Sequence, residues 1–176
     1  TTIIKSPKKQ VAISRDKGYV IIGERINPTG RKVLQAELKE GKFDMVRRDA
    51  KAQIAAGAAI LDVNAGLPRA DEAALMVQMI KEVRDAADDP CICIDTPNPK
   101  VLEAALASYC KDGAKPLVNS VSAETKSLRE VLPLIKQYGA AVIGLVSGDA
   151  GIPNSAEERL ANADRIMDEA AKIGIP

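Results

Sequence analysis

Polar side chains that could bind a ligand follow several short apolar runs of the sequence. Asp95 closes the run that begins at Cys91, and Asn119 closes the next run along the chain. An earlier run ends in Asp62 and Asn64. The chain contains no histidine, so any acid–base step must use carboxylates, lysines, amides or the ligand itself. The candidate chemistry is therefore hydrogen bonding and proton transfer by acids and amides.

The run before Asp95 has the length and composition of a buried strand. In an extended strand alternate side chains share a face, which places Cys91, Cys93 and Asp95 on one side and Ile92 and Ile94 on the other. We therefore expect Asp95 to lie on an inner face of a sheet, at the point where its strand ends.

The same strand pattern occurs five times, and each strand precedes a segment with helical periodicity. The expected strands are residues 19–25, 59–64, 91–95, 116–120 and 140–146. This alternation is typical of right-handed βαβ units in a parallel sheet, whose polar strand ends form binding sites. Five units do not close an eight-stranded barrel of about 250 residues. The pattern thus allows an open doubly wound sheet, which composition weakly favours, or part of a barrel.

The composition argues against several classes of protein. The chain of 176 residues is 46% hydrophobic, which is enough for the core of one domain. Its 25 basic and 24 acidic residues nearly cancel and aromatic residues make up only 2%, so we expect neither a nucleic acid nor a membrane as partner. No apolar run approaches the roughly 20 residues of a membrane span. The three cysteines fit reduced core thiols better than a metal site, so we expect a cytoplasmic protein without a bound metal.

Residues 1–18 form a basic segment that we separate from the main domain, residues 19–176. Val11–Ile13 is expected to be the first arm of a hairpin whose second arm is the strand at Tyr19, with the polar residues between them as the turn. Such a hairpin would cap the amino end of the sheet.

Five strand-end motifs carry a resemblance to a known family. They are IGERIN at 22–27, LDVNAG at 61–66, CIDTPN at 93–98, VNSVSAE at 118–124, and IGL at 143–145 with GIP at 151–153. In this order and spacing they resemble the pterin-binding methyltransferases, above all the methyltetrahydrofolate:corrinoid protein methyltransferases. The resemblance extends from about Tyr19 to Pro176.

The resemblance implies an α/β fold of the (β/α)8 TIM-barrel type that holds the pterin ring of a tetrahydrofolate at its carboxyl face. This chain would contain about the first five βα units and end before strand six. Asp95 and Asn119 stand where members of the family bind the pyrimidine half of the pterin. A carboxylate accepts two adjacent N–H groups of such a ring, while an amide both donates and accepts.

Five further positions match binding residues of the family. Asp62 and Asn64 match polar positions near the ring, and Glu24 and Asn27 match the first-strand signature. Asn98 is retained after strand three, although the two residues before it depart from the usual Ser-Thr-Asn of the family.

The implied reaction is methyl transfer between N5 of methyltetrahydrofolate and the cobalt of the cobalamin carried by a partner corrinoid protein. The catalytic residue is unknown, because the asparagine that contacts N5 in this family is expected beyond Pro176. The full-length protein is expected to form a homodimer. Two alternatives stay open: a dihydropteroate synthase-like enzyme, whose loops after strands one and two match poorly here, and a non-catalytic folate-binding fragment.

Overall fold

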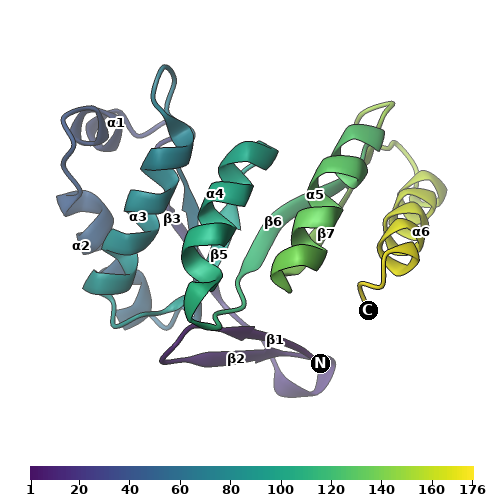
Figure 1. The fold of residues 1–176 in the computed structure, drawn as a ribbon, viewed down its shortest axis with the longest axis horizontal. Helices are drawn as coiled ribbons and strands as arrows, with labels where there is room; N and C mark the ends of the chain where they lie inside the picture. The colour runs from purple at the N-terminus through teal and green to yellow at the C-terminus, as the bar shows by residue number, and fades with distance from the viewer.

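The computed structural model describes residues 1–176, in which strands and helices alternate along most of the chain (Figure 1). The strands are β1 (Thr2–Lys5), β2 (Gln10–Ile13), β3 (Ile22–Ile26), β4 (Ile60–Asn64), β5 (Cys91–Asp95), β6 (Leu117–Ala123) and β7 (Ala141–Gly148). The helices are α1 (Lys32–Lys39), α2 (Asp44–Ala55), α3 (Glu72–Ala86), α4 (Pro99–Tyr109), α5 (Thr125–Tyr138) and α6 (Ala156–Lys172), with short 3-10 helices η1 (Arg15–Lys17) and η2 (Cys110–Asp112). The five predicted strands of the main domain correspond to β3 to β7.

Strands β3 to β7 form one parallel sheet in which the order of the strands follows the chain. Buried side chains from all six α-helices join a single core with Leu61, Ile92 and Val118 of the sheet, so the helices cover one face. A doubly wound sheet has helices on both faces and a reversal in strand order. Sequential order with the helices on one side is the winding of a (β/α)8 barrel. The weak preference for an open doubly wound sheet was therefore wrong, and the chain forms about five βα units of a barrel.

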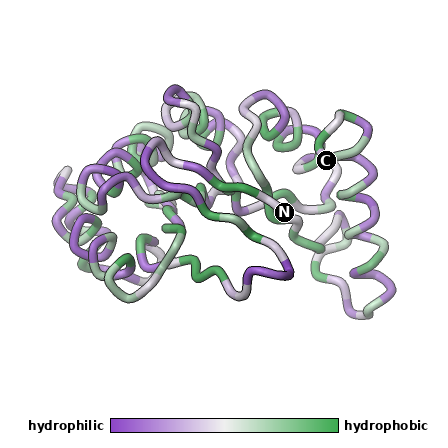
Figure 2. Tube along the Cα trace, turned by 90° about the horizontal axis from the view of Figure 1, so that it is seen from below, coloured by the Kyte–Doolittle hydropathy of each residue, from purple (hydrophilic) through white to green (hydrophobic).

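The opposite face of the sheet carries a second, smaller core. Cys91, Cys93 and Leu117 lie there and pack against Ile4 of the N-terminal hairpin, whereas Ile92 belongs to the helix-covered core. The predicted alternation of faces along β5 is confirmed. In Figure 2, which views the molecule from the hairpin side, the helices at the periphery carry much of the hydrophilic colour. Side chains two apart along a strand share a face, so the polar groups of the strands lie on the same face as this smaller core. This is the inner face of the sheet.

Strand β3 pairs with β4 through a shift in register between Gly23 and Ile26. Near this shift, the backbone N–H of Arg25 donates to the side-chain oxygen of Gln53 on α2, at 2.8 Å. Gln53 lies so close to β3 that a Cβ atom at Gly23 would come within 2.6 Å of its Oε1. A glycine at position 23 therefore allows α2 to pack against the first strand of the sheet.

The N-terminal hairpin forms between β1 and β2, with Ile4 paired opposite Val11. The predicted pairing of Val11 to Ile13 with a strand at Tyr19 is wrong, because Tyr19 is fully exposed and β3 begins only at Ile22. Strand β2 pairs with β1 because this pairing buries Ile4 of β1 completely against the first residues of β4, β5 and β6. The hairpin lies across the amino ends of these strands (Figure 1). The division of the chain at residue 18 stays a prediction.

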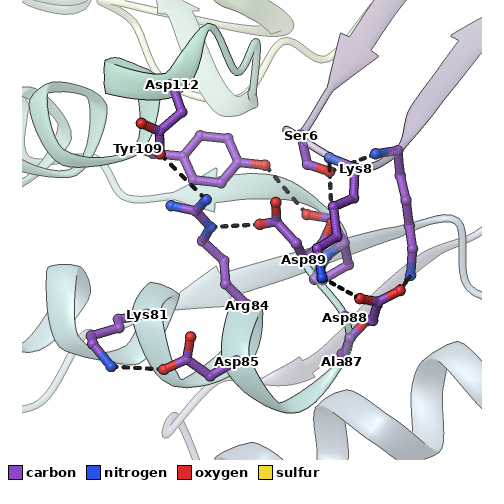
Figure 3. Close-up of polar contacts among 12 residues, drawn as sticks. Ser6, Lys8, Lys81, Arg84, Asp85, Ala87, Asp88, Asp89, Tyr109 and Asp112 are labelled. Atoms are coloured by element: carbon purple, nitrogen blue, oxygen red, sulfur yellow. Dashed lines mark hydrogen bonds and ion pairs between the residues drawn. The ribbon is translucent and has the colours of Figure 1, made fainter.

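Polar contacts fasten the hairpin to the turn between α3 and β5 (Figure 3). Ser6 Oγ donates to the backbone carbonyl of Asp89 at 2.6 Å, and Lys8 forms an ion pair with Asp88 at 2.6 Å. Arg84 of α3 binds the Asp89 carboxylate, also at 2.6 Å, and so supports the same turn. Because exposed ion pairs contribute little, we expect the buried Ser6 hydroxyl and the apolar contacts of β1 to supply most of the attachment.

Local signals in the sequence place several helix ends. Ser155 caps α6 by accepting the backbone N–H of Glu158 at 3.1 Å, while the Glu158 carboxylate accepts the N–H of Asn154 at 2.7 Å. Gly139 ends α5 with a positive φ of 64°, a conformation that glycine adopts without strain. None of the helices combines the length and the apolar character that a bilayer span requires.

Candidate functional site

The predicted acid and amide lie side by side on adjacent strands, but Asn119 does not end its strand as predicted, because β6 continues to Ala123. Asp95 at the end of β5 pairs in register with Asn119 of β6 and, on its other side, with Asn64 at the end of β4. Asp62, two residues before Asn64 and on the same face, lies opposite Cys93. The parallel register therefore brings four of the predicted site residues together.

Asn64 connects the loop after β4 to the carboxylate of Asp95. Its Oδ1 accepts the backbone N–H of Gly66 at 2.8 Å, and its Nδ2 donates to Asp95 Oδ2 at 2.9 Å. Asp95 is half-buried, and this is its one side-chain hydrogen bond within the chain. One carboxylate oxygen is thus held by the protein, while the other can accept from a ligand.

Asp62 lies two residues before the end of β4 and is only 5% exposed. Asn119 Nδ2 donates to Asp62 Oδ2 over a long 3.4 Å. Burial and the charges of Asp95 and Glu24 raise the pKa of Asp62 to about 6, against the opposing effect of hydrogen bonds from Cys93 and Asn119. Asp62 therefore exchanges a proton close to neutral pH, in a chain that contains no histidine.

The residues of the site are not arranged as a metal centre. No group of three or more His, Cys, Asp or Glu side chains in the chain is placed to hold a metal ion. Burial, together with the neighbouring Asp62, raises the pKa of the Cys93 thiol far above its ordinary range. The thiol therefore stays protonated, whereas metal binding requires a thiolate.

A cavity of about 430 Å³ opens beside Asp95 and Asn119. Its other lining residues are Pro97, Ser120, Ser122, Glu124, Ser127, Leu145 and Ser147. Asp62 and Asn64 do not line the cavity. They hydrogen-bond to Asn119 and Asp95, which do. The volume lies within the range of small-molecule sites, and the wall combines hydroxyl, amide and carboxylate groups.

The serine residues of this wall were missed by sequence reasoning. The fourth strand was expected to end at Ser120, but β6 continues to Ala123 and carries Ser122 into the cavity wall. Ser122 is tied to the start of α5, because its backbone N–H donates to Ser127 Oγ at 2.9 Å. The signal that could have revealed Ser120 and Ser122 is their alternation with Val121 and Ala123 directly after Asn119.

The other three predicted residues do not line the cavity. Asn27 Oδ1 accepts the N–H of Thr29 at 2.8 Å and stabilises the turn after β3. Asn98 is exposed, and its Oδ1 caps α4 by accepting the N–H of Lys100 at 3.0 Å. Glu24 is exposed and influences Asp62 through its charge. A ligand contact by any of these three residues stays a prediction.

A network that sequence reasoning also missed ties together two loops beside the cavity. Asp149, which follows β7, accepts the backbone N–H of Thr125 at 2.9 Å and its hydroxyl at 2.8 Å, and Arg165 of α6 donates to the same carboxylate at 2.9 Å. These contacts hold the pKa of Asp149 at about 2. Because Thr125 begins α5, the negative charge also meets the positive end of a helix dipole. The network fixes the start of α5 relative to the loop after β7.

Comparison with known proteins finds a matching family and a related enzyme. A family model described as "Pterin binding enzyme" matches residues 23–173. The methylcorrinoid:tetrahydrofolate methyltransferase of Eubacterium limosum is 33% identical over 155 residues. This alignment covers 87% of the chain and 55% of that enzyme, so the chain spans about half the length of the curated relative.

Solved structures of dihydropteroate synthases share the fold. The enzyme from Thermus thermophilus superposes with a TM-score of 0.67 at 20% identity, covering 99% of this chain and 62% of that one. The enzyme from Vibrio fischeri gives a TM-score of 0.62 at 21% identity, covering 99% of this chain and 63% of that one. At such low identity the likeness supports the barrel-type arrangement of the five βα units and says nothing of the reaction.

Proposed function

The chain belongs to the family of pterin-binding enzymes, and we propose that it binds a tetrahydrofolate and acts in methyl transfer between N5 of the folate and the cobalt of a corrinoid protein. The name of the relative from Eubacterium limosum supports the pairing of these two substrates. That name describes transfer from the methylcorrinoid to tetrahydrofolate. The same site would serve the reverse direction, because a reaction and its reversal pass through one transition state.

The observation that carries the proposal is the pairing of Asp95 with Asn119 in register, beside one cavity. The pyrimidine half of a pterin presents an amino group, a ring N–H and a carbonyl oxygen along one edge. The free oxygen of Asp95 can accept from the N–H groups, and the amide of Asn119 can donate and accept at the same edge. The chemistry of these two residues therefore fits the ring.

Holding the ring in one orientation is the share of the reaction that we assign to these residues. The cobalt of the corrinoid partner supplies the methyl acceptor or donor, so the chain needs no nucleophilic side chain. Methyl transfer requires the acceptor to approach the methyl carbon in line with the bond to the donor, which breaks as the new bond forms. A ring fixed by Asp95 and Asn119 reduces the freedom that this alignment must otherwise overcome.

Calorimetric titration of the chain with methyltetrahydrofolate tests the binding half of the proposal. The D95A variant should bind roughly 100-fold more weakly, because a charge-assisted hydrogen bond contributes about 1.5–3 kcal/mol and two N–H groups lose their acceptor. D16A is the matched control, since Asp16 is exposed in η1 at the hairpin end of the molecule. Equal affinities of D95A and the unmodified chain would contradict the proposed pterin site.

The transfer half needs a corrinoid protein. Absorbance of the corrinoid should change when the chain, methyltetrahydrofolate and a reduced corrinoid protein are combined, and D95A should slow this change in proportion to its loss of affinity. Binding of the folate without any absorbance change would favour a folate-binding role. Formation of a dihydropteroate from a pterin diphosphate and an aminobenzoate would instead support the synthase-like alternative.

A further inference from the structure

We propose that Asn64 is a positioning residue that acts on the pterin through Asp95 and does not touch the ring itself. The inference deepens the proposed function and rests on it. The family resemblance predicted Asn64 among the binding residues, but it does not line the cavity that Asp95 borders. Its two hydrogen bonds run from a backbone amide at one end to the candidate ligand-binding carboxylate at the other.

The backbone N–H of Gly66 determines which end of the Asn64 amide faces Asp95. A backbone N–H can only donate, so the amide group must present its oxygen to Gly66, which it does at 2.8 Å. The approach is close, because a Cβ atom at Gly66 would lie 3.0 Å from Asn64 Oδ1. With its oxygen engaged, the amide has its NH2 group left for Asp95, at 2.9 Å. The loop after β4 thus sets the direction of the donor.

The donor in turn restricts the carboxylate of Asp95. Held at Oδ2, the carboxylate cannot rotate freely about its terminal bond, and Oδ1 is left without a partner in the chain. Asp95 and Asn64 are also in register at the ends of neighbouring strands, so the backbone fixes the distance between their Cα atoms. A ligand therefore meets an acceptor whose orientation is established before binding, which lowers the entropic cost of binding.

The N64D substitution separates this role from simple support of the loop. It keeps the shape of the side chain and the oxygen that accepts from Gly66, but it replaces the donor to Asp95 with a second carboxylate. If Asn64 only stabilises the loop, N64D should bind methyltetrahydrofolate like the unmodified chain. If Asn64 positions Asp95, N64D should bind roughly 10- to 100-fold more weakly, as expected for losing a hydrogen bond to a charged group.

The pH dependence gives a readout that loop support would not change. Once protonated, the introduced carboxyl group can donate to Asp95 again, so the deficit of N64D relative to the unmodified chain should shrink as the pH falls from 8 to 6. The ionisable groups around this position are Asp95 and Cys93 on β5, Asp62 on β4 and Glu24 on β3. They are present in both proteins, and taking the ratio of the two affinities at each pH corrects for them to first order.

A double-mutant cycle shows whether Asn64 acts through Asp95. Affinities for methyltetrahydrofolate are measured by calorimetry for the unmodified chain, N64A, D95A and the double variant. We expect N64A to weaken binding roughly tenfold in the unmodified chain and to have no further effect in the D95A background. Q137A is the control for loss of an amide, since Gln137 is exposed near the end of α5. Urea unfolding of each variant confirms that it is folded.

The outcomes separate this inference from the proposed function. If the unmodified chain binds no methyltetrahydrofolate, the proposed function fails, and this inference fails with it. If the chain binds and D95A weakens binding, but N64D binds normally or N64A and D95A have additive effects, the proposed function stands and the positioning role is overturned. Loss of affinity in N64D, recovered at lower pH and coupled to Asp95, supports it.

Discussion

Replacing Asp62 with asparagine removes a buried acid from the site while keeping the shape of the side chain. Asp62 is 5% exposed, and burial is the largest of the effects that raise its pKa from the ordinary 3.8 to about 6. An acid with a raised pKa holds its proton more tightly in the folded chain than in the unfolded one. The folded state must therefore accept a costly buried charge at neutral pH.

The sign of the pH dependence follows from these two pKa values. Between about pH 4 and pH 6 the unfolded chain has released the proton while the folded chain retains it, so the free energy of unfolding falls as the pH rises. The contribution of the protonated Asp62 to the free energy of unfolding is fully present below pH 4 and has been lost above about pH 6. The difference of about 2 pKa units corresponds to at most about 3 kcal/mol.

The D62N variant should lack this contribution to the pH dependence. We expect it to unfold at nearly the same urea concentration as the unmodified chain at pH 4, and to be roughly 2–3 kcal/mol more stable at pH 7.5. Circular dichroism during urea unfolding at several pH values measures both quantities. D16N is the matched control, because it removes an exposed carboxylate. A stability difference between D62N and the unmodified chain that is the same at pH 4 and pH 7.5 would refute the reasoning.

Two further substitutions test how the fold positions the site. G23A should lower the free energy of unfolding by about 1–3 kcal/mol, because its Cβ would lie 2.6 Å from Gln53 Oε1, and adding Q53A should recover part of the loss in urea unfolding. I4A should cost about 2–5 kcal/mol, since Ile4 is completely buried between the hairpin and the sheet, whereas I3A on the opposite face of β1 should cost clearly less. Equal losses in the free energy of unfolding for I4A and I3A would show that burial of Ile4 in the smaller core does not hold the hairpin against the sheet.

The order of strands and helices could be predicted because each signal is local. The strand at 91–95 was placed correctly to the residue, since an apolar run is bounded by Pro90 and by the turn after Asp95. The alternation of side chains then put Cys93 and Asp95 on the same face. Asp95 and Asn119 were also correctly expected to lie together, but the reason is the register between β5 and β6, because Asn119 lies within β6 and does not end it.

The pairing of the hairpin shows where local signals fail. A turn-forming segment after Val11–Ile13 suggested a partner at Tyr19, but β2 pairs with β1 instead. The deciding interaction is the burial of Ile4 against residues of β4 to β6, far along the chain. The partners of Asp149, which are 24 and 16 residues away, were hidden for the same reason.

The sequence by itself determined which residues carry polar chemistry, which strand they lie on and which face they share, because these depend on neighbours within a few positions. Only the tertiary structure decided the division between residues that border the cavity and residues that hydrogen-bond to them. Asp95 and Asn119 border the cavity, while Asn64 and Asp62 hydrogen-bond to them from strand β4. That division depends on the register between strands and on which oxygen of each side chain is already engaged, and both are fixed by contacts between segments distant in the sequence.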